Sequence, residues 1–394
     1  MLFLLLAGAA LFANAALAQR LPHFLEAYSP AQLFPGADRL GPPEGRPLAA
    51  RAYAGQQPLG YVYLTTDVVN TRGYSSKPID VVVGLADNGR IVAARLVEHH
   101  EPIVLIGIPQ SKVEAFIQGY VGLNFIESPP RPGAQPPVDI ISGATVTLMV
   151  IGDSITRSAI AVARARLAGT APASAGQATP VAQRAVNDTL GPAESWQTLL
   201  NQGAVHRLHL TVNDVNRAFE GAGRADAAAR PETANGADTF IDLYAALVSV
   251  PTIGRSLLGD ATWQHLSGTL KPGQQALLVA GNGAYSFKGS GYVRGGIFDR
   301  IEIIQHENSF RFRDRNHQRL ADVAAAGAPW FAEVALFVVP DDATLDPTAP
   351  WRVQLMVQRV LSVQNKAFVT FDLPYELGQA YTRPAAHAAA TPAA

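Results

Sequence analysis

The chain has 394 residues, of which 48% are hydrophobic and 16% are charged, so it can bury more than one sizeable core and we expect more than one domain. Its formal net charge of -1 provides no basic excess for a phosphate backbone, which argues against direct nucleic-acid contact. The sequence contains no cysteine, which excludes disulfides, thiol nucleophiles and cysteine-ligated zinc or iron-sulfur sites within it. Redox chemistry would therefore require a bound organic cofactor.

Residues 1–18 form an apolar block that ends in Ala16-Leu17-Ala18, the small-residue pattern at which signal peptidases cleave. We expect a signal peptide over residues 1–18 and export of the rest, the alternative being an uncleaved membrane anchor. The block lacks a preceding charged segment, which suggests that the natural start lies upstream. No later stretch provides the ~20 apolar residues of a spanning helix, so we expect a soluble mature chain.

A first domain is expected over residues 55–169, after an irregular, Pro- and Gly-rich lead-in over residues 19–54. Three β-rich runs predict an antiparallel sheet, and Asn88-Gly89 between the last two favours a tight hairpin. Apolar spacing predicts two flanking helices. The predicted strands are 61–66, 79–85 and 91–97, and the predicted helices are 111–120 and 146–167.

A flexible linker rich in Ala, Pro, Ser and Gly is expected over residues 170–190, and a disordered tail over residues 377–394. Between them, residues 191–376 predict a second, mainly β domain with a helical start, including an amphipathic helix over residues 238–247. Its predicted strands are 276–279, 297–304, 310–313, 332–339, 351–357 and 367–371. The predicted fold class is α+β: an antiparallel-sheet domain with flanking helices, followed by a mainly β domain.

The most informative segment is Asp139-Ile140-Ile141-Ser142-Gly143-Ala144-Thr145, which directly precedes a predicted helix. Gly143 and Ala144 allow a bulky anion to approach the backbone, and the free N–H groups and dipole of the helix N-terminus favour a phosphate there. Thr145 offers a hydroxyl at the same place. The alternative is an ordinary helix cap after a tight turn.

The pattern Asp139-x-x-Ser142-Gly143-Ala144-Thr145 resembles the flavinylation motif of the FMN-binding domains in NqrC, RnfG and NosR proteins. In that family a flavin transferase esterifies FMN to the last threonine of the motif. The resemblance implies that Thr145 carries covalent FMN, with Thr147 as a second candidate that is better suited to a cap or backbone contact. The other motif positions expected near the cofactor are Asp139, Ser142, Gly143 and Ala144.

The segment His99-His100-Glu101-Pro102 resembles the His-His-Glu-Pro pattern that NosR proteins carry in place of the HxETPGxG segment of RnfG-like domains. The resemblance implies that His99, His100 and Glu101 border the flavin. The alternative is a surface turn. Adjacent histidines project to opposite sides of an extended chain, so we expect no metal site here.

A third segment, residues 72–79, is similar to the Gly-Tyr-x-x-x-Pro-Ile element of the same family. It implies that Tyr74 borders the flavin and that Lys77 meets its phosphate or ribityl chain, although a turn before an ordinary strand explains these residues as well. Arg157, on the second predicted helix, is expected to be solvated. Resemblance to NosR proteins continues through residues 251–259 to about Tyr375.

The resemblance implies an exported electron-transfer flavoprotein rather than a substrate-converting enzyme, located on the periplasmic side of the bacterial inner membrane. FMN would pass electrons from a membrane partner to the nitrous oxide reductase system. NosR proteins continue into membrane helices and cysteine-rich iron-sulfur modules, so we expect a fragment or a split gene. The alternatives are a redox sensor that controls nitrous oxide reductase gene expression indirectly, through a membrane part, and an unmodified binding or scaffold module.

Overall fold

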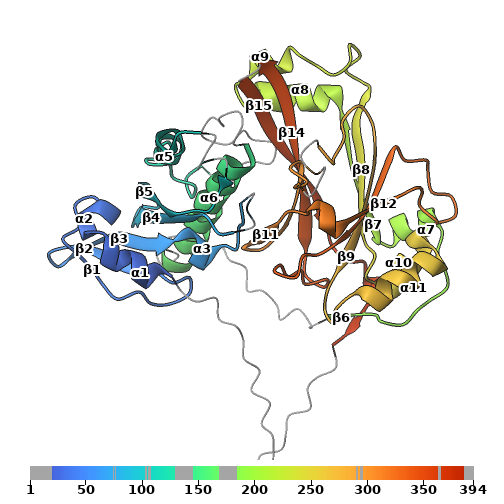
Figure 1. Ribbon diagram of the computed structural model, residues 1–394, viewed down its shortest axis with the longest axis horizontal. Coiled ribbons are helices and arrows are strands. Elements are labelled where there is room, and N and C mark those ends of the chain that lie inside the picture. The colour runs from blue at the N-terminus through green and yellow to red at the C-terminus, as the bar shows by residue number, and fades with distance from the viewer. Residues whose placement is uncertain are drawn as a thin grey trace, which may run out of the picture.

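The computed structural model describes residues 20–73, 75, 77–102, 104, 108–128, 145–167, 184–289, 292, 296–362 and 365–385. The chain forms two lobes that lie side by side, which we call the first lobe (residues 20–167) and the second lobe (residues 184–385) (Figure 1). Both lobes are built on antiparallel sheets, and helices flank the sheet of the first, so the predicted α+β class is confirmed. The predicted signal peptide, residues 1–18, lies outside the described residues.

The first lobe contains a five-stranded antiparallel sheet in the order β1-β2-β3-β4-β5. Gly89 has a φ of 82° in the turn between β4 and β5, which confirms the predicted hairpin. The strands are β1 (Arg39–Leu40), β2 (Ala50–Ala54), β3 (Gln57–Leu64), β4 (Asp80–Ala86) and β5 (Ile91–Glu98).

Helices cover both faces of this sheet, because neighbouring side chains along a strand point to opposite sides. Val81 and Val83 of β4 belong to the same hydrophobic core as α5 and α6, whereas Val82 packs in the core formed with α1 and α2. The double coverage explains why β4 is buried almost throughout. The helices are α1 (Leu21–Ala27), α2 (Pro30–Leu33), α3 (Thr65–Val68), α5 (Gln110–Gln118) and α6 (Thr145–Leu167).

The prediction of an irregular lead-in over residues 19–54 is wrong, because the described part of this range includes two helices and two strands, α1, α2, β1 and β2. Pro22 and Pro30 each lie in the first turn of a helix, where proline needs no hydrogen-bond acceptor and its fixed φ is favourable. Leu21 and Leu33 are fully buried against the sheet. The prolines therefore start helices here instead of preventing them.

An ion pair attaches the start of α1 to the sheet. The Asp80 side chain is 1% exposed, and its Oδ2 lies 2.5 Å from Nη1 of Arg20. The hydroxyl of Thr66 also donates to this carboxyl. Burial raises the pKa of Asp80 above its ordinary value of 3.8, although the Thr66 hydrogen bond and the Arg20 charge oppose the shift.

This raised pKa predicts a specific pH dependence. The folded chain holds the Asp80 proton more tightly than the unfolded chain does, so protonation of Asp80 stabilises the fold at low pH. This stabilisation is lost as the pH rises from the ordinary pKa of an aspartate through the higher pKa of the folded state. We therefore compare the free energy of unfolding of the wild type with that of Asp80→Asn. The difference, wild type minus variant, should fall as the pH rises through that window. Urea titrations at steps from about pH 4 to 7 measure it; a difference that rises with pH would contradict the assignment.

The second lobe contains a five-stranded sheet in the order β12-β13-β9-β8-β7 and a four-stranded sheet in the order β11-β10-β14-β15. One hydrophobic core joins the two sheets. The first sheet comprises β7 (Val205–Thr211), β8 (Thr239–Leu247), β9 (Ala276–Asn282), β12 (His317–Leu320) and β13 (Glu333–Val338). The second comprises β10 (Ile301–Gln305), β11 (Asn308–Phe310), β14 (Trp351–Ser362) and β15 (Asn365–Tyr375). Its helices are α7 (Trp196–Asn201), α8 (Val212–Gly221), α9 (Ala225–Ala228), α10 (Pro251–Leu258), α11 (Asp260–Thr269) and the short 3-10 helices η1 (Asp314–Asn316) and η2 (Gln379–Tyr381).

The helix predicted over residues 238–247 is wrong: this segment is β8, which pairs with β7 on one side and β9 on the other. Phe240 and Ile241 are adjacent and both fully buried, so the strand is covered on both faces. A strand of this kind is a nearly continuous apolar run, and periodicity alone does not distinguish such a run from a buried helix.

The prediction of a linker over residues 170–190 is wrong for residues 184–186, and the prediction of a disordered tail over residues 377–394 is wrong for residues 379–384, because these residues form regular structure. β6 (Arg184–Val186) pairs with β16 (Thr382–Pro384), and η2 precedes β16. Tyr381 is 3% exposed, which anchors the end of the tail in the core of the second lobe. The local composition did not show this pairing because its two strands are about two hundred residues apart. Residues 168–183 and 386–394 lie outside the described part.

Within the part of the chain that the structure describes, no helix combines the length and the apolar composition needed to cross a membrane.

Candidate functional site

The helix α6 begins at Thr145, where the motif predicted a helix start, and extends to Leu167. Leu148, Ile151 and Ile155 are buried against the sheet, which fixes the helix in place. The first turn contains no acidic residue, and its N–H groups have no acceptor within the helix. Together with the positive end of the helix dipole, these groups fit a phosphate.

Most of the predicted motif lies outside the described residues. This holds for Asp139, Ser142, Gly143 and Ala144, and for the side chain of Thr145. Thr147 is described, and it is 1% exposed. Its hydroxyl donates to Oε2 of Glu101 at 2.6 Å, so this threonine faces the interior of the lobe.

Glu101 connects the three segments that the sequence singled out. Its side chain is fully buried, and besides the Thr147 hydroxyl it accepts a hydrogen bond from the backbone N–H of Ser75 at 2.9 Å. Gly73 lies directly against this carboxylate, because a Cβ at that position would be 2.2 Å from Oε1 of Glu101. The structure thus brings residues 72–79, the His-His-Glu segment and the start of α6 to one place.

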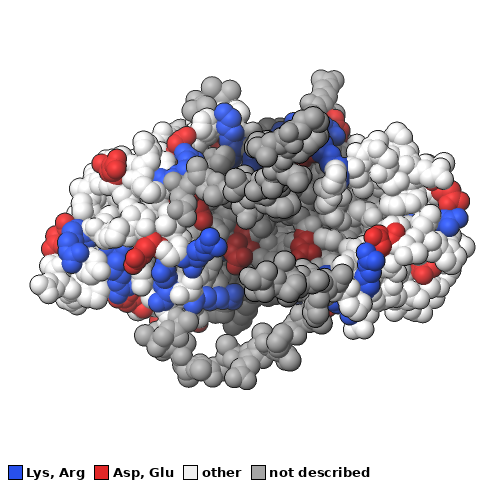
Figure 2. Space-filling view, turned by 90° about the horizontal axis from the view of Figure 1, so that it is seen from below, with Lys and Arg blue, Asp and Glu red and all other residues white. Residues whose placement is uncertain are grey.

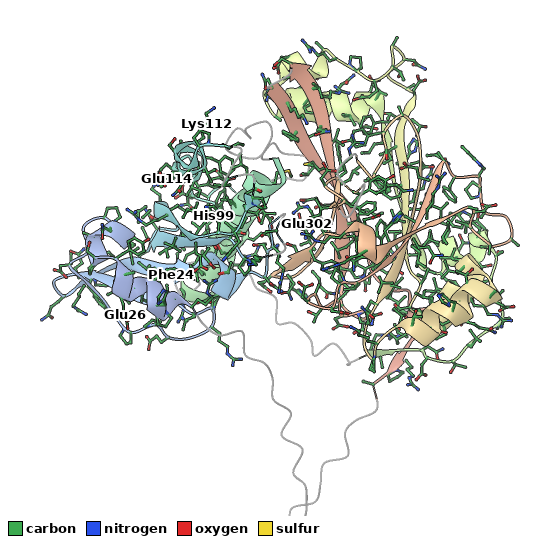
Figure 3. The ribbon with its side chains drawn as sticks, in the orientation of Figure 1. Phe24, Glu26, His99, Lys112, Glu114 and Glu302 are labelled. Carbon is green, nitrogen blue, oxygen red and sulfur yellow. The ribbon has the colours of Figure 1, made fainter. Side chains whose placement is uncertain are left out.

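The other predicted site residues lie around this centre. His99 is half-buried, and its Nδ1 accepts from the backbone N–H of Glu101 at 3.3 Å (Figure 3). His100 is exposed, with its Nε2 3.9 Å from Oε1 of Glu98. Lys77 is exposed, and Tyr74 lies outside the described residues. No group of three or more potential metal-ligating side chains occurs among the residues that are described.

Removing the Glu101 carboxylate should destabilise the first lobe. Glu101→Ala removes the acceptor of the buried Thr147 hydroxyl and of the half-buried Ser75 N–H. Hydrogen bonds to charged groups contribute about 1.5–3 kcal/mol each, so we expect a loss of about 2–4 kcal/mol in the free energy of unfolding. Urea titration followed by far-UV circular dichroism measures it. All four tryptophans lie in the second lobe, so their fluorescence reports that lobe separately.

The matched control is Glu114→Ala, since Glu114 is an exposed glutamate on α5 of the same lobe (Figure 3). It should change the free energy of unfolding by less than about 0.5 kcal/mol. Equal losses in the two variants would show that the buried carboxylate contributes nothing special to the lobe.

The second lobe contacts the segment that leads into this site. Asn70 forms an isolated β-bridge with Asn308, and Nη1 of Arg72 lies 2.9 Å from Oδ2 of Asp342. Arg157 was expected to be solvated, but its side chain is 13% exposed and donates to the backbone oxygen of His306 at 2.8 Å. Sequence reasoning missed these contacts because each joins residues far apart along the chain.

A groove of about 960 Å³ runs along the same junction. Figure 2 shows lysine and arginine side chains of the first lobe beside it. Four arginines and one histidine outnumber the two carboxylates in its wall, so an anionic surface or ligand is favoured there. The charged and titratable residues of the wall are Arg46, Arg157, Arg164, Arg352, His306, Asp67 and Glu307.

Residues 73–159 match the FMN-binding domain, a range that begins at Gly73 and includes Glu101 and Thr145. The chain is 41% identical over 368 residues to "Regulatory protein NosR" of Pseudomonas aeruginosa, which covers 91% of this chain and 50% of that protein.

Two further relatives are similar over most of the chain. "Regulatory protein NosR" of Stutzerimonas stutzeri is 39% identical, covering 89% of this chain and 48% of that protein. "Protein NirI" of Paracoccus denitrificans is 33% identical, covering 82% and 45% respectively. The chain therefore spans about half the length of the curated relatives it matches.

Proposed function

We propose that this chain, which contains an FMN-binding domain and is homologous to the NosR and NirI proteins, carries FMN esterified through its phosphate to Thr145. The start of α6 at this residue supports the proposal, because the N–H groups of its first turn suit a phosphate. Thr147 is the other candidate, and its hydroxyl is buried in a hydrogen bond to Glu101. Of the two threonines, Thr145 is therefore the better acceptor for a flavin transferase.

The role that follows from such a modification is electron transfer. Bound FMN would supply one- and two-electron redox chemistry, while the chain would set its orientation and its access to solvent. Glu101 would hold the segment around Ser75 against the start of α6, through its hydrogen bonds from Ser75 and Thr147. In this proposal the exported chain lies on the periplasmic side of the inner membrane, accepts electrons from a membrane partner and serves the nitrous oxide reductase system.

A redox sensor is the second candidate, because two relatives are named regulatory proteins. Asn70 and Arg72 both contact the second lobe, through a β-bridge and an ion pair respectively. They lie in the same short segment as Gly73, which packs against Glu101. A change in the position of Gly73 would therefore alter the contacts of Asn70 and Arg72 with the second lobe. Regulation of gene expression by this route would be indirect and would need a membrane partner.

One experiment tests the modification and then the role. The chain is co-expressed with a flavin transferase in an exporting, denitrifying host that lacks its own copy. We expect in-gel flavin fluorescence after denaturation, and the mass of FMN minus one water on the peptide that contains Thr145. An unmodified wild-type chain would contradict the covalent proposal and leave a binding or scaffold module.

Nitrous oxide consumption and reductase transcript are then compared in hosts with modified and unmodifiable chains. Lost consumption with a normal transcript supports the electron carrier. A lost transcript supports the sensor. If both are normal without the flavin, neither role holds.

A further inference from the structure

A small cavity lies between the lobes, where Arg72 and Gly73 of the first lobe face residues of the second. Its volume is about 30 Å³, and its wall includes these two residues of the first lobe and residues 309–311, 313, 315 and 316 of the second. Since one water molecule needs about 10–15 Å³ by this measure, there is room for two or three waters or for one small ion.

We propose that this cavity binds a small tetrahedral oxyanion of the phosphate or sulfate class. Four arginines line it, and Asp342 is the one carboxylate among the described lining residues. Guanidinium groups present fixed, forked donors that match oxyanions. One of these arginines comes from the first lobe and three come from a single segment of the second: they are Arg72, and Arg311, Arg313 and Arg315.

Buried polar atoms in the wall give an independent indication of a ligand. The Arg311 side chain is 6% exposed; it forms an ion pair with Glu302 through Nη2, while its Nε has no hydrogen-bond acceptor among the described residues. Ser309 is 4% exposed, and its hydroxyl, although close to Glu302, likewise has no partner of good geometry in the described part. Leaving a buried donor unsatisfied costs about 1–3 kcal/mol, and a bound oxyanion would accept from both.

Size and charge exclude other occupants. The cavity is far smaller than the roughly 300–1,000 Å³ of pockets for organic ligands, so it does not accept a nucleotide or a peptide. A metal cation is disfavoured by the four arginines. An anion held by Arg72 of one lobe and Arg315 of the other would join the lobes, and it would stabilise their contact by mass action.

The test is isothermal titration of the full, flavin-loaded chain with inorganic phosphate and sulfate at constant ionic strength. Saturable binding is expected, and Arg315→Gln should weaken it about tenfold, the equivalent of about 1.4 kcal/mol. Arg315 is exposed, so its replacement should leave the fold intact. Ser309→Ala should weaken binding by a smaller factor. Arg319→Gln, an exposed arginine on β12 that does not line the cavity, is the matched control and should bind as the wild type does.

Several outcomes would overturn the proposal: no saturable binding, equal weakening in the Arg319→Gln control, or acetate and nitrate binding as tightly as phosphate. The site does not depend on the proposed flavin, and the unmodifiable Thr145→Val chain distinguishes the two. Phosphate should bind this variant as tightly as it binds the flavin-loaded chain. If flavin loading abolishes phosphate binding, the cavity belongs to the flavin phosphate and a separate anion site is excluded.

Discussion

Thr145→Val is expected to abolish covalent flavin attachment completely while leaving the first lobe folded. Valine has the shape of threonine without the hydroxyl that would form the phosphoester, and α6 is fixed by buried residues further along, such as Leu148 and Ile151. In-gel fluorescence and peptide mass after co-expression with a flavin transferase measure the modification. Far-UV circular dichroism of the same preparation reports the fold.

Two matched variants make this result specific to Thr145. Thr145→Ser keeps a hydroxyl at the same place and should retain at least part of the modification. Thr147→Val removes the hydroxyl that donates to Glu101, so it should lower the stability of the first lobe by about 1–3 kcal/mol and still be modified at Thr145. Flavin that persists in Thr145→Val, or that disappears only in Thr147→Val, would refute the assignment.

Arg311→Met should be the most destabilising single change in the second lobe, with a loss of about 3–5 kcal/mol in the free energy of unfolding. Arg311 and Glu302 are each 6% exposed and pair with one another, so the variant leaves a buried carboxylate without its cation. Burial already raises the pKa of Glu302, an effect that Arg311 opposes. The loss should therefore be greater at neutral pH than in mild acid, where protonation removes the unpaired charge.

Tryptophan fluorescence during urea unfolding measures this effect in the lobe concerned. The double variant Arg311→Met/Glu302→Met should recover most of the loss, because two apolar side chains replace the pair without leaving a buried charge. Arg217→Met is the control, since Arg217 is 71% exposed in its pair with Asp214 and such surface pairs contribute only about 0–1 kcal/mol. A double variant as unstable as the single one would mean that shape, and not charge, decides the stability here.

Local patterns predicted those elements whose cause is local. The hairpin at Gly89 follows from the need for a positive φ, and α6 follows from the spacing of its apolar face. β8 was mistaken for a helix because it is buried on both faces, and the pairing of β6 with β16 joins segments that share no local pattern. In each of these failures, the deciding contact comes from a distant part of the chain.

The sequence indicated which residues belong to the candidate site, but it did not indicate which hydrogen bonds join them. The resemblance selected Glu101, yet nothing in the sequence indicated that its carboxylate would accept from both Ser75 and Thr147. Charged side chains on helices are usually solvated, whereas Arg157 is 13% exposed and donates to the backbone oxygen of His306 in the second lobe. The junction between the lobes, with its arginine-lined cavity, depends on tertiary contacts that no motif encodes.

The pairing of β6 with β16 also determines how the second lobe responds to mechanical force. Residue Arg184 lies directly opposite Pro384, so the two ends of the lobe emerge together at one end of a short antiparallel ribbon. Tension applied between these ends would load the ribbon's hydrogen bonds one after another, like a zipper, because they lie across the strands. The ribbon would therefore peel open at low force and protect the core behind it from strain.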